Sequence, residues 1–291
     1  LIERVREEIR VFRHLSQHEN VVGYVDSFID EQRGRVYIFQ ELCDLNLKMC
    51  LERQMDRITD QLMLHWCRTI SNVLLHIHDN GYVHRDIKPA NILLKREVDP
   101  VDASKKVLSL KVCDFGLSKY VVQSAAKTNV GSTCYIAPEV SSHSVIIRDN
   151  NNHKGGHNVQ SNNNHHHGLV MNGREGTDPM LCDPVAAVDR SSSSAMAMMN
   201  TRKKYTNKCD IWSFGVLIYQ LIGRIRDEVD LPNFARLLKE KPHIVEKSRH
   251  LKQALDNGDH ILHELALVCV KCLKLNPYDR PTAREIKEQI S

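Results

Sequence analysis

Apolar and polar residues follow two rhythms along this chain, one with the period of a helix and one with that of a strand. Charged residues surround apolar ones that recur every three or four positions near the start, at Ile2, Val5, Ile9 and Phe12. This spacing predicts an amphipathic helix. The apolar runs Val21–Val25 and Val36–Phe39, separated by a turn around Glu31–Gly34, predict two strands of a small sheet.

Helical periodicity dominates the rest of the chain. The pattern predicts helices over residues 60–78, 210–221, 260–273 and 281–290 and short strands over residues 91–94 and 108–113. The polar stretch Lys95–Lys106 between those strands is predicted to be a surface loop. Residues 210–221 are apolar on most sides, which predicts a helix buried at the centre of an α-rich region. Together these elements predict an α+β fold.

Residues 141–204 differ in composition from everything around them. Homopolymeric tracts occur at Asn150–Asn152, Asn162–Asn164, His165–His167 and Ser191–Ser194. Such a segment buries too little apolar area to offset the entropy lost on ordering it, so we predict a disordered insertion. Its histidines suggest a metal site as the alternative. No carboxylate or cysteine recurs at ligand spacing, however, which favours an expanded low-complexity repeat.

Composition narrows the classes of partner. The net charge of +4 over 291 residues is too small and too evenly spread to indicate nucleic acid. No apolar run approaches the roughly 18 residues of a membrane span. The nine cysteines are odd in number and scattered, which predicts reduced thiols in the cytoplasm, with the nucleus as an alternative. Cys269 and Cys272 form a CxxC pair within an apolar helical run, so we expect buried core thiols, not zinc.

The clearest chemical signal comes from two strings, HRDIKPAN and DFG. Phosphoryl transfer from a nucleotide requires a carboxylate to orient the attacking hydroxyl, a cation to steady the phosphate, and oxygen ligands for magnesium. Asp86, Lys88, Asn91 and Asp114 supply these groups in that order. With Ala137–Glu139 downstream, the region closely resembles the catalytic loop, magnesium loop and activation segment of eukaryotic protein kinases.

The resemblance implies a two-lobed fold, ATP and Mg²⁺ as cofactors, and a protein substrate with a serine or threonine acceptor. It implies catalytic roles for Asp86, Lys88 and Asn91. It assigns Mg²⁺ to Asn91 and Asp114, and contacts with the nucleotide to Lys88, Asn91 and Asp114. A lysine at position 88 is typical of the serine/threonine-specific branch. The sequence carries no signal for an oligomeric state.

Further positions are assigned to the nucleotide site by the same resemblance. Glu8 matches the helix glutamate that pairs with a phosphate-binding lysine in the family, and Glu7 is the alternative. Gln40 falls at the position that closes the back of the adenine pocket. The linker that follows, from Glu41 to Cys43, supplies the backbone groups expected to bond the adenine edge.

Other matches concern the activation segment and the scaffold. Arg85 is expected to pair with a phosphorylated residue, for which Thr128 is the predicted site. Glu139 and Arg280 resemble a buried ion pair that ties this segment to the last helix. Asp210 resembles the buried acid that holds the backbone of the catalytic loop. We therefore expect these last three residues to support the site without acting in it.

The resemblance divides the chain into a partial N-lobe at 1–43, C-lobe parts at 44–140 and 205–291, and the insertion at 141–204. The family's glycine-rich loop and strand lysine occur nowhere in the sequence, which predicts a truncated and inactive fragment. A pseudokinase or scaffold is the non-enzyme alternative, and a small-molecule kinase is another. The stretch His18–Tyr24 has a weaker local likeness to the NEK group.

Overall fold

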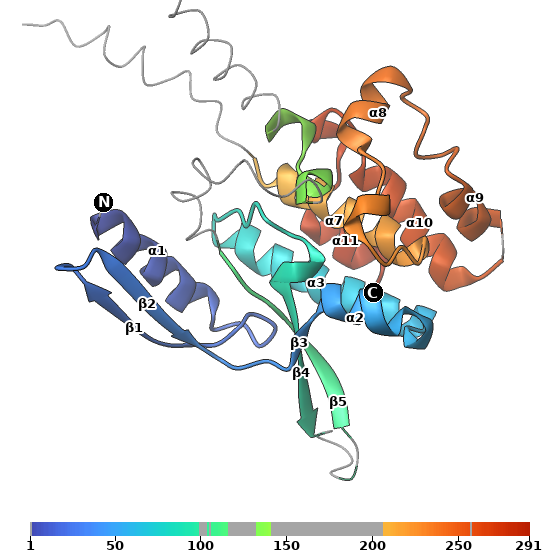
Figure 1. Cartoon of the computed structure of the whole chain (residues 1–291). Helices are drawn as coiled ribbons and strands as arrows, with labels where there is room; N and C mark the ends of the chain where they lie inside the picture. Colours follow the sequence, from blue (N-terminus) through green and yellow to red (C-terminus); the bar gives the residue numbers. More distant parts are fainter. Residues whose placement is uncertain (1, 99–103, 105, 116–131, 141–205, 257) are drawn as a thin grey trace, which may run out of the picture. The chain divides into compact units, whose positions relative to one another are not determined.

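Figure 1 shows the computed structural model, which describes residues 2–98, 104, 106–115, 132–140, 206–256 and 258–291. The contacts divide the chain into two units, Leu1–Ser144 with Tyr205–Ser291, and Val145–Lys204. The features below belong to the first unit. The predicted insertion at 141–204 and the predicted phosphosite Thr128 lie outside the described residues.

The first helix and hairpin arise from the first apolar pattern. Helix α1 (Ile2–Leu15) buries Phe12 and Leu15 on its apolar face, as predicted. Strands β1 (Tyr24–Asp30) and β2 (Arg35–Gln40) form an antiparallel hairpin alongside α1 (Figure 1). Its turn contains Gly34 with φ of +61°, a backbone conformation that glycine adopts readily.

The prediction of a strand at Val21–Val25 is wrong in its boundaries. Strand β1 begins only at Tyr24, and the two preceding valines pair with the other sheet instead. The Val22 N–H donates to the Val112 carbonyl at 2.9 Å, and both valines are fully buried. The apolar run therefore marks a buried seam between the two sheets, which a strand pattern alone does not distinguish from a hairpin strand.

The second sheet has the order β3–β4–β5 and is antiparallel throughout. It consists of β3 (Leu45–Asn46), β4 (Ile92–Val98) and β5 (Lys106–Val112). The prediction of a loop over Lys95–Lys106 is wrong at both ends, because pairing continues to Val98 opposite Lys106. The polar residues of this extension have partners in the sheet or beside it. Arg96, for example, donates its N–H to Asp44 at 2.8 Å.

The remainder of the described chain is mostly helical. Its α-helices are α2 (Leu47–Gln54), α3 (Asp60–Asp79), α7 (Lys208–Ile222), α8 (Phe234–Glu240), α9 (Arg249–Asp256), α10 (His260–Cys272) and α11 (Ala283–Gln289). Short 3₁₀ turns are η1 (Met55–Arg57), η2 (Pro89–Asn91), η3 (Ser132–Tyr135), η4 (Glu228–Asp230) and η5 (Pro277–Asp279). The four predicted helices correspond to α3, α7, α10 and α11, whereas α2, α8 and α9 were not predicted. The α+β fold class is confirmed.

Helix α7 is buried along most of its length, as its sequence predicts. Gly215 lets α10 approach closely, because a Cβ there would lie 2.6 Å from the Cβ of Cys272. Cys269 and Cys272 are fully buried free thiols, which confirms them as core residues. Burial raises the pKa of both. None of the described helices has the length and apolar character needed to cross a membrane.

Candidate active site

A buried carboxylate holds the loop between α3 and η2. Asp210, fully buried on α7, accepts the His84 N–H at 2.9 Å and the Arg85 N–H at 2.6 Å. It also accepts a hydrogen bond from Nε2 of His78 at 2.9 Å. Burial favours a raised pKa for Asp210, but the hydrogen bonds, led by that from His78, outweigh it and hold the pKa below its usual value. The predicted scaffold role of Asp210 is confirmed, while the contribution of His78 was not predicted.

The loop adopts an uncommon backbone conformation at its centre. Arg85 has φ of +73°, in the left-handed region that side chains other than glycine rarely occupy. Bonds from two consecutive N–H groups to Asp210 hold this turn. Positions held in such conformations by their surroundings cluster at functional sites.

His84 joins this loop to the segment after β5. Its Nε2 bonds the Cys113 carbonyl at 3.0 Å, its Nδ1 accepts the Asp86 N–H at 3.3 Å, and its ring lies beside Phe115. Burial lowers the pKa of His84 more than the nearby Asp210 raises it, so the ring is neutral at physiological pH. The sequence motif did not predict this bridging role.

Three of the predicted site residues form one hydrogen-bonded cluster. Lys88 Nζ donates to Asp86 Oδ2 at 2.7 Å, and Asn91 Nδ2 donates to the same oxygen at 2.8 Å. Asn91 Nδ2 also donates to the Asp86 main-chain carbonyl at 2.9 Å. Asp86 and Lys88 are partly exposed, whereas Asn91 is buried. The cluster therefore presents a carboxylate and a cation to solvent above a fixed amide.

The register of β4 and β5 brings Asp114 to the same place. Ile92 pairs with Val112, and the Cys113 N–H donates to the Asn91 carbonyl at 3.0 Å. Antiparallel strands place the start of β4 beside the end of β5, so Asn91 and Asp114 lie at one end of the strand pair. Asp114 has φ of +66° and an exposed side chain.

These two residues fit the chemistry of a hard cation. Both hydrogen bonds of the Asn91 amide go to oxygen acceptors, which identifies the donor atom as nitrogen and leaves Oδ1 available as a ligand. Within the described ranges no group of three or more histidine, cysteine, aspartate or glutamate side chains forms a metal site. A metal here would therefore depend on mixed amide and carboxylate oxygens, which suit Mg²⁺.

The helix glutamates lie on different faces of α1. Glu7 is exposed and pairs with Arg10 on the same helix. Glu8 is half-buried, and burial raises its pKa. Among the residues that the structure describes, no cation pairs with Glu8. Glu8 is therefore the more sheltered of the two glutamates, and its pairing with a phosphate-binding lysine stays a prediction.

The predicted linker follows β2 directly. Gln40 is exposed at the strand's end, Leu42 is 88% exposed, and Cys43 is half-buried with a pKa raised by burial. In the described part of the chain the Glu41 carbonyl and the Cys43 N–H have no hydrogen-bond partner, so both are available to a ligand. The Glu41 side chain, in contrast, bonds to Lys95, Lys111 and the Gly23 N–H. The sequence did not predict that second use of Glu41.

Comparison with models of protein families identifies the family to which this chain belongs. The model of the protein kinase domain matches residues 2–153, which is more than half of the 291-residue chain. The chain belongs to the protein kinase family. A second kinase model, that of the protein tyrosine and serine/threonine kinases, matches residues 194–290.

The matches to individual relatives cover less than half of this chain. A probable serine/threonine-protein kinase of Encephalitozoon cuniculi is 40% identical over 124 residues, 43% of this chain and 21% of that protein. The probable serine/threonine-protein kinase zyg-1 of Caenorhabditis briggsae is 32% identical over 138 residues, 47% and 18% of the two chains. Calcium-dependent protein kinase 7 of rice is 36% identical over 140 residues, 48% and 24%. The matched stretches span less than a quarter of each relative, and the NEK likeness stays a prediction.

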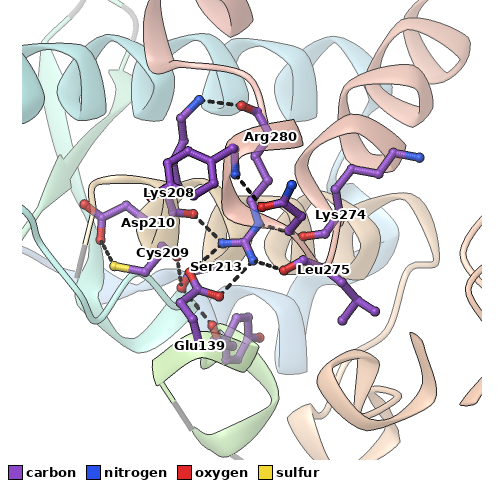
Figure 2. Close-up of polar contacts among 11 residues, drawn as sticks. Glu139, Lys208, Cys209, Asp210, Ser213, Lys274, Leu275 and Arg280 are labelled. Atoms are coloured by element: carbon purple, nitrogen blue, oxygen red, sulfur yellow. Dashed lines mark hydrogen bonds and ion pairs between the residues drawn. The ribbon is translucent and has the colours of Figure 1, made fainter. Parts of the chain in front are cut away.

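The kinase scaffold contains one further predicted pair, drawn in Figure 2. Arg280 is 2% exposed and forms two bonds to Glu139, at 2.7 and 2.9 Å. Its remaining N–H groups donate to the carbonyls of Lys208, Lys274 and Leu275, so all five are used. The guanidinium also lies 5.0 Å from the ring centre of Trp212. The predicted ion pair is confirmed.

Proposed function

We propose that this chain is the core of a serine/threonine protein kinase, which transfers the γ-phosphate of ATP to serine or threonine hydroxyls of protein substrates. The observation that carries the proposal is the bonded cluster of Asp86, Lys88 and Asn91 beside Asp114. The lysine at position 88 and the serine/threonine relatives support the choice of acceptor.

Asp86 is suited to receive the substrate hydroxyl. Its Oδ2 is occupied by Lys88 and Asn91, while its Oδ1 accepts no hydrogen bond from the described residues. A serine or threonine hydroxyl donating to Oδ1 is thereby oriented toward the γ-phosphorus. The bond from that phosphorus to the bridging oxygen of ADP breaks as the bond to the hydroxyl oxygen forms, and Asp86 takes the hydroxyl proton.

Lys88 and the oxygen ligands supply charge stabilisation. The Lys88 ammonium group, held at Asp86, would also neutralise charge on the transferred phosphate. Oδ1 of Asn91 and the carboxylate of Asp114 would hold Mg²⁺. The ion supplies a positive charge that stabilises the phosphate oxygens.

We further propose that these 291 residues alone transfer little phosphate. They contain no glycine-rich loop, and no cation pairs with Glu8 among the described residues. The linker from Glu41 to Cys43 would contact adenine, but the phosphates would lack backbone donors and a lysine. Positioning supplies most of the rate in this chemistry, so its loss is expected to be severe.

The test compares the 291-residue chain with a protein that joins it to a glycine-rich loop and a strand lysine. Incorporation of labelled phosphate from ATP into a general serine/threonine substrate is measured for both. The joined protein should be active, and Asp86→Asn should lower its kcat roughly 10²- to 10⁴-fold. Asp79→Asn, an exposed change at the end of α3, is the matched control and should stay within about twofold.

Each part of the proposal has its own contradicting result. A folded joined protein without activity would favour the pseudokinase or scaffold alternative. Incorporation of phosphate into tyrosine alone would contradict the proposed serine or threonine acceptor. Equal turnover by the 291-residue chain and the joined protein would show that the nucleotide is held in another way.

A further inference from the structure

The side chain of Glu41 joins several segments that are distant in sequence. Its Oε1 accepts Lys95 Nζ at 2.6 Å, and its Oε2 accepts the Gly23 N–H at 3.0 Å. Lys111 Nζ lies 3.1 Å from the same Oε2. The Glu41 main-chain N–H also donates to the Gly23 carbonyl at 2.8 Å. One residue thus binds Gly23 through both its backbone and its side chain.

The two lysines reach Glu41 from neighbouring strands. Lys111 pairs with Leu93, two residues before Lys95 on β4, so both lysine side chains emerge on one face of the sheet. The side chain of Lys111 is 12% exposed and that of Glu41 is 18% exposed. Ion pairs this sheltered are screened by salt less than surface pairs.

Gly23 is fitted to this contact. A Cβ at that position would lie 3.3 Å from Glu41 Oε2 and 3.4 Å from Glu41 Cβ, tighter than most carbon contacts. Its position also matters, because it follows Val22, which bonds Val112 of β5. The cluster of Glu41, Lys95, Lys111 and Gly23, called the hinge clamp below, therefore connects the linker, β4, β5 and the approach to β1.

Two of these elements, β4 and β5, lie next to the proposed magnesium ligands in the sequence. Strand β4 starts directly after Asn91, and β5 ends two residues before Asp114. The backbone proposed to contact adenine belongs to Glu41 itself and to Cys43. The hinge clamp thus connects the linker to the strand pair whose ends lie next to the proposed magnesium ligands.

We propose that the Glu41 side chain is a positioning residue, which fixes the linker backbone relative to the strand pair that carries Asn91 and Asp114 and so sets the affinity for the nucleotide. This inference rests on the proposed function. It assigns to the side chain a task separate from that of the Glu41 backbone.

A carboxylate suits this task better than an amide. Burial favours a raised pKa for Glu41, but hydrogen bonds from Lys95, the Gly23 N–H and Lys111 outweigh it, so the pKa lies below its usual value and the group stays ionised. Three donors converge on two oxygens that only accept. Glutamine would turn an NH₂ group toward one of the lysines and lose that bond.

The experiment uses the joined protein described above, with Glu41→Ala and Glu41→Gln variants. We expect KM for ATP to rise roughly tenfold in Glu41→Ala and less in Glu41→Gln, with kcat within about twofold, because the lost hydrogen bonds are charge-assisted. Hydrogen exchange at the Gly23 amide should accelerate in Glu41→Ala. Double replacement with Lys111→Met should add less than the sum of the single effects.

Glu97→Ala is the matched control. Glu97 lies 3.3 Å from Lys95 but does not touch the linker, so its loss should leave KM for ATP within about twofold. An unchanged KM for ATP in folded Glu41→Ala would overturn the inference. If kcat rose at the same time, the clamp would restrain the enzyme and would not position the nucleotide. If the unmodified joined protein transfers no phosphate, the proposed function fails. Unchanged exchange at Gly23 in Glu41→Ala would still refute the clamp.

Discussion

Beside and within α7, the charged side chains of Arg280 and Asp210 are buried and hydrogen-bonded, whereas the β1–β2 hairpin leaves large apolar side chains in water. Arg280 is 2% exposed with five bonded N–H groups, and Asp210 is fully buried and accepts from His78, from Cys209 and from the N–H groups of the catalytic loop. On the hairpin Phe28 is 59% exposed and Phe39 is 55% exposed. The contrast separates polar groups that the fold itself satisfies from apolar groups that it leaves uncovered.

The hairpin is attached by one side only. Tyr24 and Ile38 pack on a small cluster made by Phe12, Val22 and Cys113. An isolated two-stranded sheet is marginally stable in water, so this contact with α1 is what holds it. A mutation in the α7 network should therefore change global stability, and one on the open face of the hairpin should change association.

Arg280→Met should give the largest loss. It removes the cation but leaves the Glu139 carboxylate and three carbonyls without their donors. We expect the free energy of unfolding to fall by about 3–5 kcal/mol, measured by urea denaturation. Arg284→Met is the control, since Arg284 forms an exposed pair with Asp79 and should cost less than about 1 kcal/mol. Equal losses in the two variants would contradict the contrast.

Lower pH should reduce the free energy of unfolding through His18, which lies just after α1, by less than the loss of Arg280 does. Burial lowers the pKa of His18, His76 beside it adds to this, Glu19 opposes it, and Lys287 has a small lowering effect. At pH values above 6.5, the ordinary pKa of histidine, the contribution of neutral His18 to the free energy of unfolding is complete. It is lost as the pH falls from about 6.5 toward the lower folded pKa, because the unfolded chain then binds more protons.

His18→Asn tests this dependence. The His18 Nδ1 accepts the Asn20 N–H at 3.1 Å, and an asparagine oxygen can keep that bond without titrating. The fall in Tm between pH 7.5 and pH 5.5 should be smaller in the variant than in the unmodified chain. Buried His84, whose pKa is also lowered, should preserve part of the slope. Identical slopes would assign the whole dependence to other groups.

Phe39→Ser should have the smallest effect on unfolding. Because Phe39 is more than half exposed, the free energy of unfolding should change by less than about 0.5 kcal/mol. Self-association, followed by light scattering, should decrease because an apolar patch shrinks. Phe12→Ala, a buried aromatic on α1, is the contrasting change and should cost about 3 kcal/mol or more. A large loss in Phe39→Ser would show that its ring is covered.

Long periodic segments were predictable from sequence. The helices at 60–78 and 210–221 are α3 and α7 with ends shifted by one or two residues, since a long run of apolar residues at helical spacing is a local signal. The scaffold pairs of Glu139 with Arg280 and of Asp210 with the catalytic loop followed from the family resemblance. The structure bears out both.

What the sequence did not predict depends on distant partners. Val21 and Val22 follow a strand pattern, but their partner is Val112. Short helices such as α8 lack a long apolar repeat. The tasks of His78 and of the Glu41 side chain arise only when separate segments meet, and no local spacing encodes them.

The bonds between η3 and α7 have a consequence for the length of chain that can connect these two elements. Ser213 donates to the Tyr135 carbonyl at 2.8 Å, and Arg280 holds Glu139, so the chain is fastened just before residue 141 and again from Lys208 onward. In polymer terms, joining two points that the fold holds fixed costs only about 0.6 kcal/mol more for each doubling of the connecting length. Insertions and deletions between the fastened ends are therefore the changes that this position should tolerate best.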